Sequence, residues 1–178
     1  SYNDFFTNGI YSIFKEKNPI RILKKYNKET KDFDLKCNLF LGGKDGNKLY
    51  FGKPMIYDEG RSHFMYPNEA RLRNMTYGIT IHYDVEVEFI FPGKEPRIET
   101  LSKMFLGRFP IMMMSDLCIL NKLGSSVRFE LGECRNDRGG YFIIDGKEKC
   151  IVSQEKFADN MLYVRDKVND LYSHSSEI

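Results

Sequence analysis

The sequence predicts an α+β fold, in which a mostly antiparallel sheet is joined by an N-terminal helix and a few short helices. Two patterns carry this prediction. From Gly78 to Phe91 every odd position is apolar from residue 79 onward, while polar residues fill the even positions from 80 to 88, as in a strand with one buried face. Between Phe5 and Phe14 apolar residues recur at helical spacing, which indicates an amphipathic helix that Asn18-Pro19 should end.

The composition is that of an ordinary globular domain. A chain of 178 residues fits one domain, and 42% hydrophobic with 29% charged residues is a typical balance. No apolar run approaches the roughly 18 residues that cross a bilayer, and the first residues lack the features of a secretory signal, so we expect an intracellular protein. A net charge of +2 means that any nucleic-acid contact must come from a local basic patch.

The four cysteines, at positions 37, 118, 134 and 150, are widely spaced, and no histidine cluster lies beside them. Zinc ligands usually come in close sequence pairs, so we expect buried, reduced thiols rather than a zinc site.

Two segments follow the first helix. The stretch from Ile20 to Thr30 is rich in lysine and arginine, and could contact nucleic acid or simply form a solvated connection. We favour the connection because Tyr26 is its only aromatic residue. Alternation from Phe33 to Leu41 predicts a half-buried strand, which a turn at 42–47 should return as a hairpin into Lys48–Met55.

A polar loop and a short helix come next. We expect Tyr57–Ser62 to be a loop whose acids, Asp58 and Glu59, are solvated. A helix should begin at Pro67, because proline suits the first helical position. Glu69 and Arg73 then form an i,i+4 pair, and we expect both Arg73 and its neighbour Arg71 to serve the structure of the domain.

The stretch Phe91–Pro96 should break the long strand, and Lys103–Met114 is the next extended segment. Pro110 cannot donate to a ladder, so it should lie at an edge or a bend. The stretch 121–138 predicts a short helix and loop, with four apolar anchors: Leu123, Val127, Phe129 and Leu131.

The last hairpin contains the candidate site. Gly140 opens it, and Asp145-Gly146 is a strong signal for a type I′ turn. Its register would place Lys147, Lys149, Ile151 and Ser153 on one face and Glu148, Cys150, Val152 and Gln154 on the other. Lys149 would then suit a phosphate without a competing acid on its face, and Gln154 would suit a sugar or phosphate edge. The alternative is that these are ordinary solvated residues.

Four blocks, in order, resemble the N-terminal part of the second-largest subunit of multisubunit DNA-dependent RNA polymerases, closer to its archaeal and eukaryotic branch than to its bacterial one. They are LYFGKPM at 49–55, YPNEARLRNMTY at 66–77, GRFPIM at 107–112 and GGYFIIDGKEKCIVSQE at 139–155. The resemblance implies the domain called the protrusion, over residues 1–172, with 173–178 starting the connection to an absent lobe domain.

The resemblance also implies roles for individual residues. Lys149 and Gln154 would lie close to the RNA:DNA hybrid, with Lys147 as a weaker candidate. Eight residues of the matching blocks would be structural: Glu69, Arg71, Arg73, Gly107, Pro110, Gly140, Asp145 and Gly146.

As part of such a polymerase the chain would contribute to nucleotidyl transfer without being catalytic itself. Magnesium, and zinc as a further expectation, would belong to the whole enzyme and not to this stretch. The implied partners are template DNA, the RNA:DNA hybrid, the largest and other polymerase subunits and initiation factors, but no membrane. The location would be nucleus, cytoplasm, or a virus factory or virion, according to source.

Two alternatives are a stand-alone nucleic-acid-binding module and an assembly module whose edge strands dock other subunits. The first would need exposed aromatic and basic residues on one sheet face, whereas the even face of the long strand carries Asp84, Glu86 and Glu88. The second is compatible with a polymerase fragment.

Overall fold

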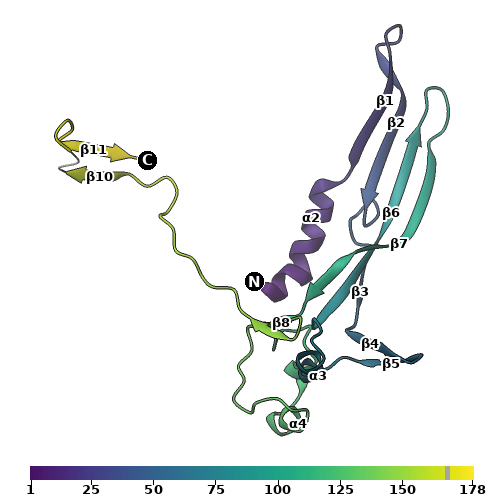
Figure 1. The fold of residues 1–178 in the computed structure, drawn as a ribbon. Coiled ribbons are helices and arrows are strands. Elements are labelled where there is room, and N and C mark those ends of the chain that lie inside the picture. Colours follow the sequence, from purple (N-terminus) through teal and green to yellow (C-terminus); the bar gives the residue numbers. More distant parts are fainter. Residues whose placement is uncertain (167–168) are drawn as a thin grey trace.

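The computed structural model describes residues 1–166 and 169–178, and it has the predicted α+β fold with mostly antiparallel strands (Figure 1). In chain order the elements are α1 (Tyr2–Asp4), the π-helical η1 (Phe5–Gly9), α2 (Ile10–Lys17), β1 (Ile20–Asn27), β2 (Asp32–Leu41), β3 (Leu49–Gly52), β4 (Met55–Asp58), β5 (Arg61–Phe64), α3 (Pro67–Leu72), β6 (Gly78–Ile90), β7 (Arg97–Pro110), the 3₁₀-helical η2 (Ile119–Lys122), α4 (Ser125–Glu130), β8 (Phe142–Ile144), β9 (Lys147–Lys149), β10 (Tyr163–Asp166) and β11 (His174–Glu177). Among the described residues, no helix has both the length and the apolar character needed to cross a bilayer.

The main sheet has five strands and is built on β6, the alternating strand predicted from the sequence. Strand β7 pairs along one edge of β6. Strands β2 and β3 follow one another along the other edge, where Leu41 lies opposite Val85 and Leu49 lies opposite Tyr83. Strand β1 pairs with β2 at the outside of the sheet. Because β6 contacts three strands, its position determines the rest of the sheet.

The predicted hairpin between β2 and β3 is wrong. Both strands are antiparallel to β6, so they run in the same direction and do not pair with each other. The loop between them is tied to one residue of β6: the N–H of Gly42 donates to the carbonyl of Asp84 at 2.7 Å, and the N–H of Asp84 donates to the carbonyl of Lys48 at 3.2 Å. The chain therefore loops out and rejoins the same neighbouring strand.

The basic stretch from Ile20 is strand β1 rather than a loose connection. Its side chains are almost all exposed on both faces, so the period-two pattern that reveals a half-buried strand is missing. Lys25 has a φ of 58°, and the pair it would form with Asp34 is missing from the ladder, although the register is the same on both sides of it. Several lysines along an outer strand protect it from pairing with other chains.

The polar stretch Tyr57–Ser62 is also more ordered than predicted. It contains the tip of the β4–β5 hairpin, where Glu59 and Gly60 have φ values of 43° and 80° and form a two-residue turn. Asp58 is not simply solvated, because it binds Arg73 at the end of α3.

Strand β7 begins at Arg97 instead of Lys103, because pairing with β6 orders residues whose own side chains are exposed.

Of the four predicted anchors between 121 and 138, Leu123 and Leu131 pack against the core, whereas Val127 and Phe129 lie on the short surface helix α4 and are exposed. The prediction of buried thiols holds for Cys37 and Cys118 only, since Cys134 and Cys150 are exposed in irregular chain.

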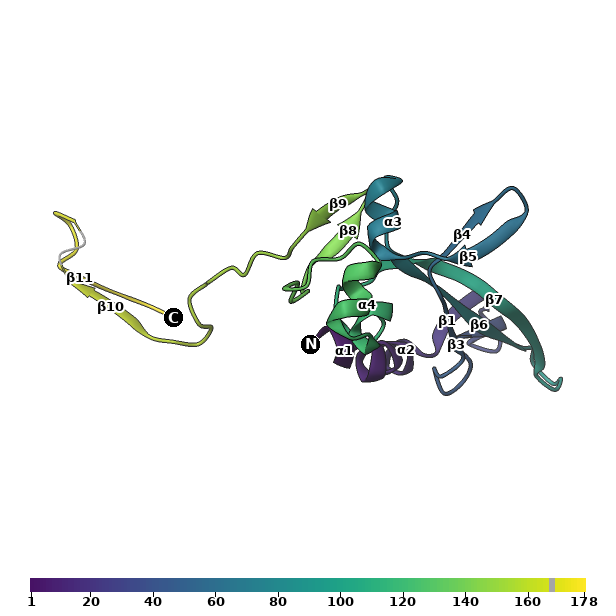
Figure 2. The ribbon, with the colours of Figure 1, turned by 90° about the horizontal axis from the view of Figure 1, so that it is seen from below.

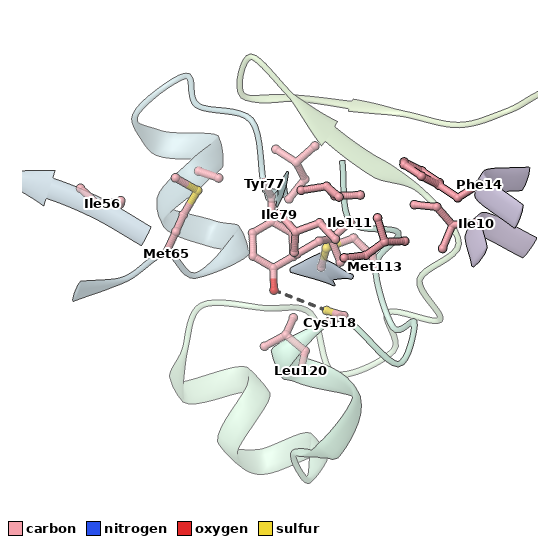
Figure 3. Packing of buried hydrophobic residues seen from close by; sticks show 14 residues of the cluster. Ile10, Phe14, Ile56, Met65, Tyr77, Ile79, Ile111, Met113, Cys118 and Leu120 are labelled. Carbon is pink, nitrogen blue, oxygen red and sulfur yellow. Dashed lines mark hydrogen bonds between the residues drawn. The ribbon is translucent and has the colours of Figure 1, made fainter. Parts of the chain in front are cut away.

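The core lies where the first helix, the base of the sheet and α3 meet (Figure 3). Helix α2 contributes Ile10 and Phe14, and the ring of Phe14 lies 5.7 Å from that of Tyr83 on β6. Asn18 ends the helix as predicted, and its amide bonds both the N–H and the carbonyl of Leu41 at 2.8 Å, which fixes the helix against β2. The buried residues of the cluster are Ile10, Phe14, Leu49, Ile56, Met65, Ala70, Tyr77, Ile79, Ile81, Ile111, Met113, Cys118, Leu120 and Ile143.

After β9 the chain leaves this body. Residues 150–162 run as an extended, irregular segment toward the β10–β11 hairpin, which lies apart from the main sheet in both views (Figures 1 and 2). Large apolar side chains in this region, such as Phe157 and Leu171, are exposed.

The acids of β6 do not form the open acidic face that the sequence suggested. Asp84 is buried, and it accepts hydrogen bonds from the Lys103 N–H at 2.8 Å and the Tyr50 hydroxyl at 2.9 Å. Glu86 pairs with Lys48 at 2.5 Å, and Glu88 accepts from the amide of Asn38. Asp84 lies at a register shift between β6 and β7, so it holds the irregular ladder together there.

We expect Asp84→Ala to lower the urea concentration at the midpoint of unfolding. The size of this decrease should become smaller as the pH falls. The hydrogen bond from the Lys103 N–H, with help from Tyr50, holds the pKa of Asp84 below its ordinary value although burial acts in the opposite direction. A depressed pKa means that the stabilisation is full above the unfolded value of about 3.9 and is lost as the pH falls through the folded value. Asp34→Ala, at an exposed acid of β2, is the control. An Asp84→Ala effect that stays constant down to about pH 2 would contradict the prediction.

Candidate nucleic-acid interface

The candidate interface is the hairpin β8–β9. Its turn is the one predicted: Asp145 and Gly146 have φ values of 51° and 74°, which is the type I′ conformation. The register places Phe142 opposite Lys149 and Ile144 opposite Lys147. Residues that alternate along a strand share a face, so the two lysines project on the same side of β9.

The turn is fixed by the segment that joins α3 to β6. The N–H of Asp145 donates to the Thr76 hydroxyl at 3.1 Å, and that hydroxyl donates to the Asp145 carboxylate at 3.2 Å. The N–H of Gly146 donates to the Met75 carbonyl, and the N–H of Tyr77 donates to the Ile143 carbonyl, both at 3.0 Å. The hairpin is therefore bound to the start of the central strand.

Arg71 of α3 makes the second set of contacts with the hairpin. Its Nε donates to Glu148 on β9 at 2.8 Å, and one terminal nitrogen donates to both carboxylate oxygens of Glu133 at 2.9 Å. The other terminal nitrogen donates to the Tyr141 hydroxyl at 2.7 Å, which in turn donates to Asp137. Burial alone would lower the pKa of Arg71, but Glu133 and its other partners raise it above the ordinary value. Arg71 therefore stays charged and neutralises these acids.

The engagement of Glu148 determines the charge that the hairpin presents. Lys147 and Lys149 are exposed on either side of Glu148 in sequence, and neither has a carboxylate within ion-pair distance among residues 1–166 and 169–178. With Glu148 held by Arg71, two ammonium groups are available to an anion. Such cations suit phosphates, which fix position without reading sequence.

Gln154 is not part of this arrangement, which corrects the predicted faces. Strand β9 ends at Lys149, so Ile151 and Gln154 share no strand face with the lysines. The ladder ends because the segment before β8, which would pair with residues after Lys149, turns away from β9. Gly139 and Gly140 in this segment have φ values of 73° and 84°. Gln154 lies exposed in the irregular segment that follows.

The predicted pair of Glu69 and Arg73 is present at 3.3 Å but is not the main contact of Arg73. Two guanidinium nitrogens of Arg73 donate to Asp58 at 2.6 and 2.9 Å, and these bonds lower the pKa of Asp58. Glu69 also bonds His63 at 3.1 Å, and this contact, with Arg73, lowers the pKa of Glu69. The Arg73–Asp58 and Glu69–His63 contacts together hold the β4–β5 hairpin against α3.

The remaining candidate structural residues lie at turns and strand ends. Gly140 has a positive φ that favours glycine, whereas a Cβ on Gly107 would meet only the Phe109 ring at 3.6 Å, so nothing in the described packing requires glycine there. Pro110 is the last residue of β7, an outer strand, and its carbonyl accepts a hydrogen bond from the Tyr2 hydroxyl at 2.7 Å. Its position agrees with the expected edge.

Within the described parts of the chain, no three histidine, cysteine, aspartate or glutamate side chains gather as a possible metal site. Magnesium and zinc thus find no fitting ligand set among these residues.

Comparison with known proteins agrees with the resemblance. The profile of the family described as RNA polymerase beta subunit matches residues 1–173. The whole chain is 34% identical to DNA-directed RNA polymerase II subunit RPB2 of Eremothecium gossypii and spans 16% of that protein. Over 74% of the chain, identity to the RPB2 of Encephalitozoon cuniculi is 40%, spanning 12% of it. Over 91% of the chain, identity to DNA-directed RNA polymerase subunit Rpo2N of Methanothermobacter thermautotrophicus is 35%, spanning 28% of it.

The two arginines of α3 should differ in their effect on stability. Arg71→Ala leaves the buried carboxylate of Glu133 without its cation, so we expect the free energy of unfolding to fall by about 3–5 kcal/mol. Arg73→Ala should cost much less, because its partners remain in contact with water. Urea unfolding of both variants measures the difference, and equal losses would contradict the assignment of Arg71 as the buried clamp.

The two type I′ turns offer a matched pair of glycine substitutions. A Cβ on Gly146 would lie 2.8 Å from the Cα of Asn74 and 3.0 Å from the Arg71 carbonyl, whereas a Cβ on Gly60 would have open space. Gly60→Ala should therefore cost only the positive-φ strain, about 1 kcal/mol, and Gly146→Ala at least about 1 kcal/mol more. Thermal melting would show the ranking, and a Gly60→Ala loss as large as that of Gly146→Ala would refute the close docking of the turn.

Proposed function

The chain belongs to the RNA polymerase beta subunit family, and on that premise we propose that it is an N-terminal part of the second-largest subunit of a DNA-directed RNA polymerase. The observation that carries the proposal is the family match over residues 1–173, with identities of 34–40% to eukaryotic RPB2 proteins and of 35% to an archaeal Rpo2N. The chain covers a small fraction of these relatives, so its role is that of a component.

In this role the chain supplies structure and not catalytic groups. The acids at its centre are occupied by structural partners: Asp84 binds backbone and tyrosine, Glu86 binds Lys48, and Glu133 binds Arg71. Nucleotidyl transfer requires magnesium held by carboxylates, and we assign that chemistry, and any zinc, to other parts of the enzyme. Residues 1–172 would form the protrusion, and 173–178 would lead toward the lobe.

We assign the contact with the RNA:DNA hybrid or template DNA to Lys149, with Lys147 beside it. The support is the pair of exposed ammonium groups on one face of a rigid hairpin, with the neighbouring acid neutralised by Arg71. Gln154 stays a candidate from family resemblance alone, since it lies outside the hairpin.

Partner subunits are the second element of the proposal. Strand β7 exposes Leu101, Met104 and Phe105, and the C-terminal segment exposes further apolar side chains. Exposed apolar surface of this kind is typical of a chain that is covered in an assembly. The largest subunit, other polymerase subunits and initiation factors are the expected partners. We infer an intracellular location, in the compartment that holds the DNA template.

The stand-alone nucleic-acid-binding module finds less support. Such a module would present stacking aromatics beside cations on an open sheet face, whereas the charged face of β6 has its acids paired with Lys48 and Asn38.

Lys149→Ala, introduced into the complete polymerase, should weaken elongation complexes to a similar extent on all template sequences. Loss of one phosphate contact is expected to reduce the slope of log affinity against log salt by about one unit. Lys94→Ala, at the exposed turn between β6 and β7, is the matched control and should leave the slope unchanged. An unaltered slope for Lys149→Ala would sink the assignment of this lysine.

A further inference from the structure

A cavity of about 430 Å³ lies between the stem of the β4–β5 hairpin and the chain around η2. Its size is within the roughly 300–1,000 Å³ of protein pockets that bind ligands. The lining residues are Lys53, Pro54, Phe64, Met65, Tyr77, Asp116, Leu117, Cys118, Ile119, Lys122 and Leu123. We call this site the Lys53–Lys122 cavity.

The floor of the cavity is apolar and internally satisfied. Met65, Tyr77 and Cys118 are buried, and Figure 3 shows the Tyr77 hydroxyl pointing toward the Cys118 thiol at 3.9 Å. That hydroxyl also accepts the Ile119 N–H at 3.3 Å. Because the polar atoms of the floor already have partners, the group that fills the cavity needs no polar atom at its inner end, and a bulky apolar side chain fits.

The mouth of the cavity is mainly positive. Lys53 comes from the link between β3 and β4, and its ammonium lies 5.3 Å from the centre of the Phe64 ring. Lys122 comes from η2 on another segment of the lining. Neither lysine is in an ion pair within residues 1–166 and 169–178. The one acid of the lining, Asp116, accepts a hydrogen bond from Asn121 at 3.4 Å.

We propose that the Lys53–Lys122 cavity is a docking site for a partner protein, which inserts one bulky apolar side chain from a short segment with acidic residues on both sides. The two cations stand on separate segments of the mouth, so two carboxylates that flank one anchor match them better than the single head group of a small ligand. The segment would also cover Phe64, which is 44% exposed. This docking site goes beyond the proposed function and does not rest on it.

A tryptophan peptide tests the proposal directly, because the chain contains no tryptophan. The probe is acetyl-Asp-Glu-Trp-Glu-Asp-amide, added to the 178-residue chain at low salt. Burial of its indole should shift the fluorescence to shorter wavelength. Binding should be roughly tenfold tighter than for the matched peptide with lysine at all four acidic positions, because the like-charged peptide meets two ammonium groups.

A charge-reversal variant makes the test specific to this site. The double variant Lys53→Glu/Lys122→Glu should prefer the lysine peptide over the acidic one. The control Lys24→Glu/Lys94→Glu makes the same change in net charge at two exposed positions away from the cavity, one on β1 and one in the turn between β6 and β7. It should keep the preference of the unmodified chain. Circular dichroism checks that each variant is folded, and both substituted pairs are exposed, so folding should be retained.

Three results would overturn the proposal. The first is a preference that the Lys53→Glu/Lys122→Glu variant does not reverse. The second is binding of indole-3-acetate, a single small anion, as tight as that of the acidic peptide, which would make the cavity a small-ligand site. The third is a dimer in sedimentation that the same double variant dissociates, which would make a second copy of the chain the occupant.

Discussion

The guanidinium of Arg71 joins parts of the chain that are otherwise far apart in sequence. It binds Glu133 and Glu148, which lie 62 and 77 residues farther along, and it also binds Tyr141. The side chain of Glu133 is only 4% exposed, and a carboxylate so deeply buried is tolerated only with a cation and hydrogen bonds. Separating helix α3 from the segment around Glu133 would therefore leave a buried charge unpaired, whereas Glu148, whose side chain is 55% exposed, adds a contact between α3 and strand β9.

The segment that follows Arg71 extends this unit into the sheet. Thr76 and Met75 bind the type I′ turn, and the backbone of Tyr77 bonds Ile143 on one side and Ile111 on the other. Tyr77 then leads directly into β6, the strand on which β2, β3 and β7 pair. A short stretch of chain thus connects the surface hairpin to the centre of the fold, and the position of Lys149 relative to the sheet is fixed by hydrogen bonds rather than by a flexible loop.

The features that could be predicted from the sequence are those that local chemistry decides. Pro67 starts a helix, alternation defines β6, and Asp145-Gly146 forms its turn because each depends on residues within a few positions. The order of β2 and β3 along β6 could not be read in this way, since it depends on the loop at Asp84 and not on the turn residues alone. The outer strand β1 was missed because both of its faces are exposed.

In the candidate site, too, the features set by nearby residues were predicted and those set by distant residues were not. The turn and the shared face of Lys147 and Lys149 follow from the two-residue hairpin, so sequence reasoning placed them correctly. The position of Gln154 did not follow from the sequence, because the length of β9 is limited by Gly139 and Gly140, which lie just before its partner strand β8. The acid partners of Arg71 had no sequence signal either, since pairs separated by more than 60 residues obey no local spacing rule.

The ion pairs of Arg71 also affect the contact with nucleic acid that we propose for Lys149. The sequence Lys147-Glu148-Lys149 carries an acid between its two cations, and a free carboxylate there would compete with phosphate for both lysines. Arg71 binds that carboxylate at 2.8 Å and keeps it on the face opposite the lysines. A residue of α3 therefore supports the positive character of the hairpin, and the structural role of Arg71 and the proposed nucleic-acid role of Lys149 both depend on the ion pairs of one guanidinium. A variant that loses the clamp would lose the local positive charge as well as stability, which is why the two effects must be separated by changing Lys149 itself.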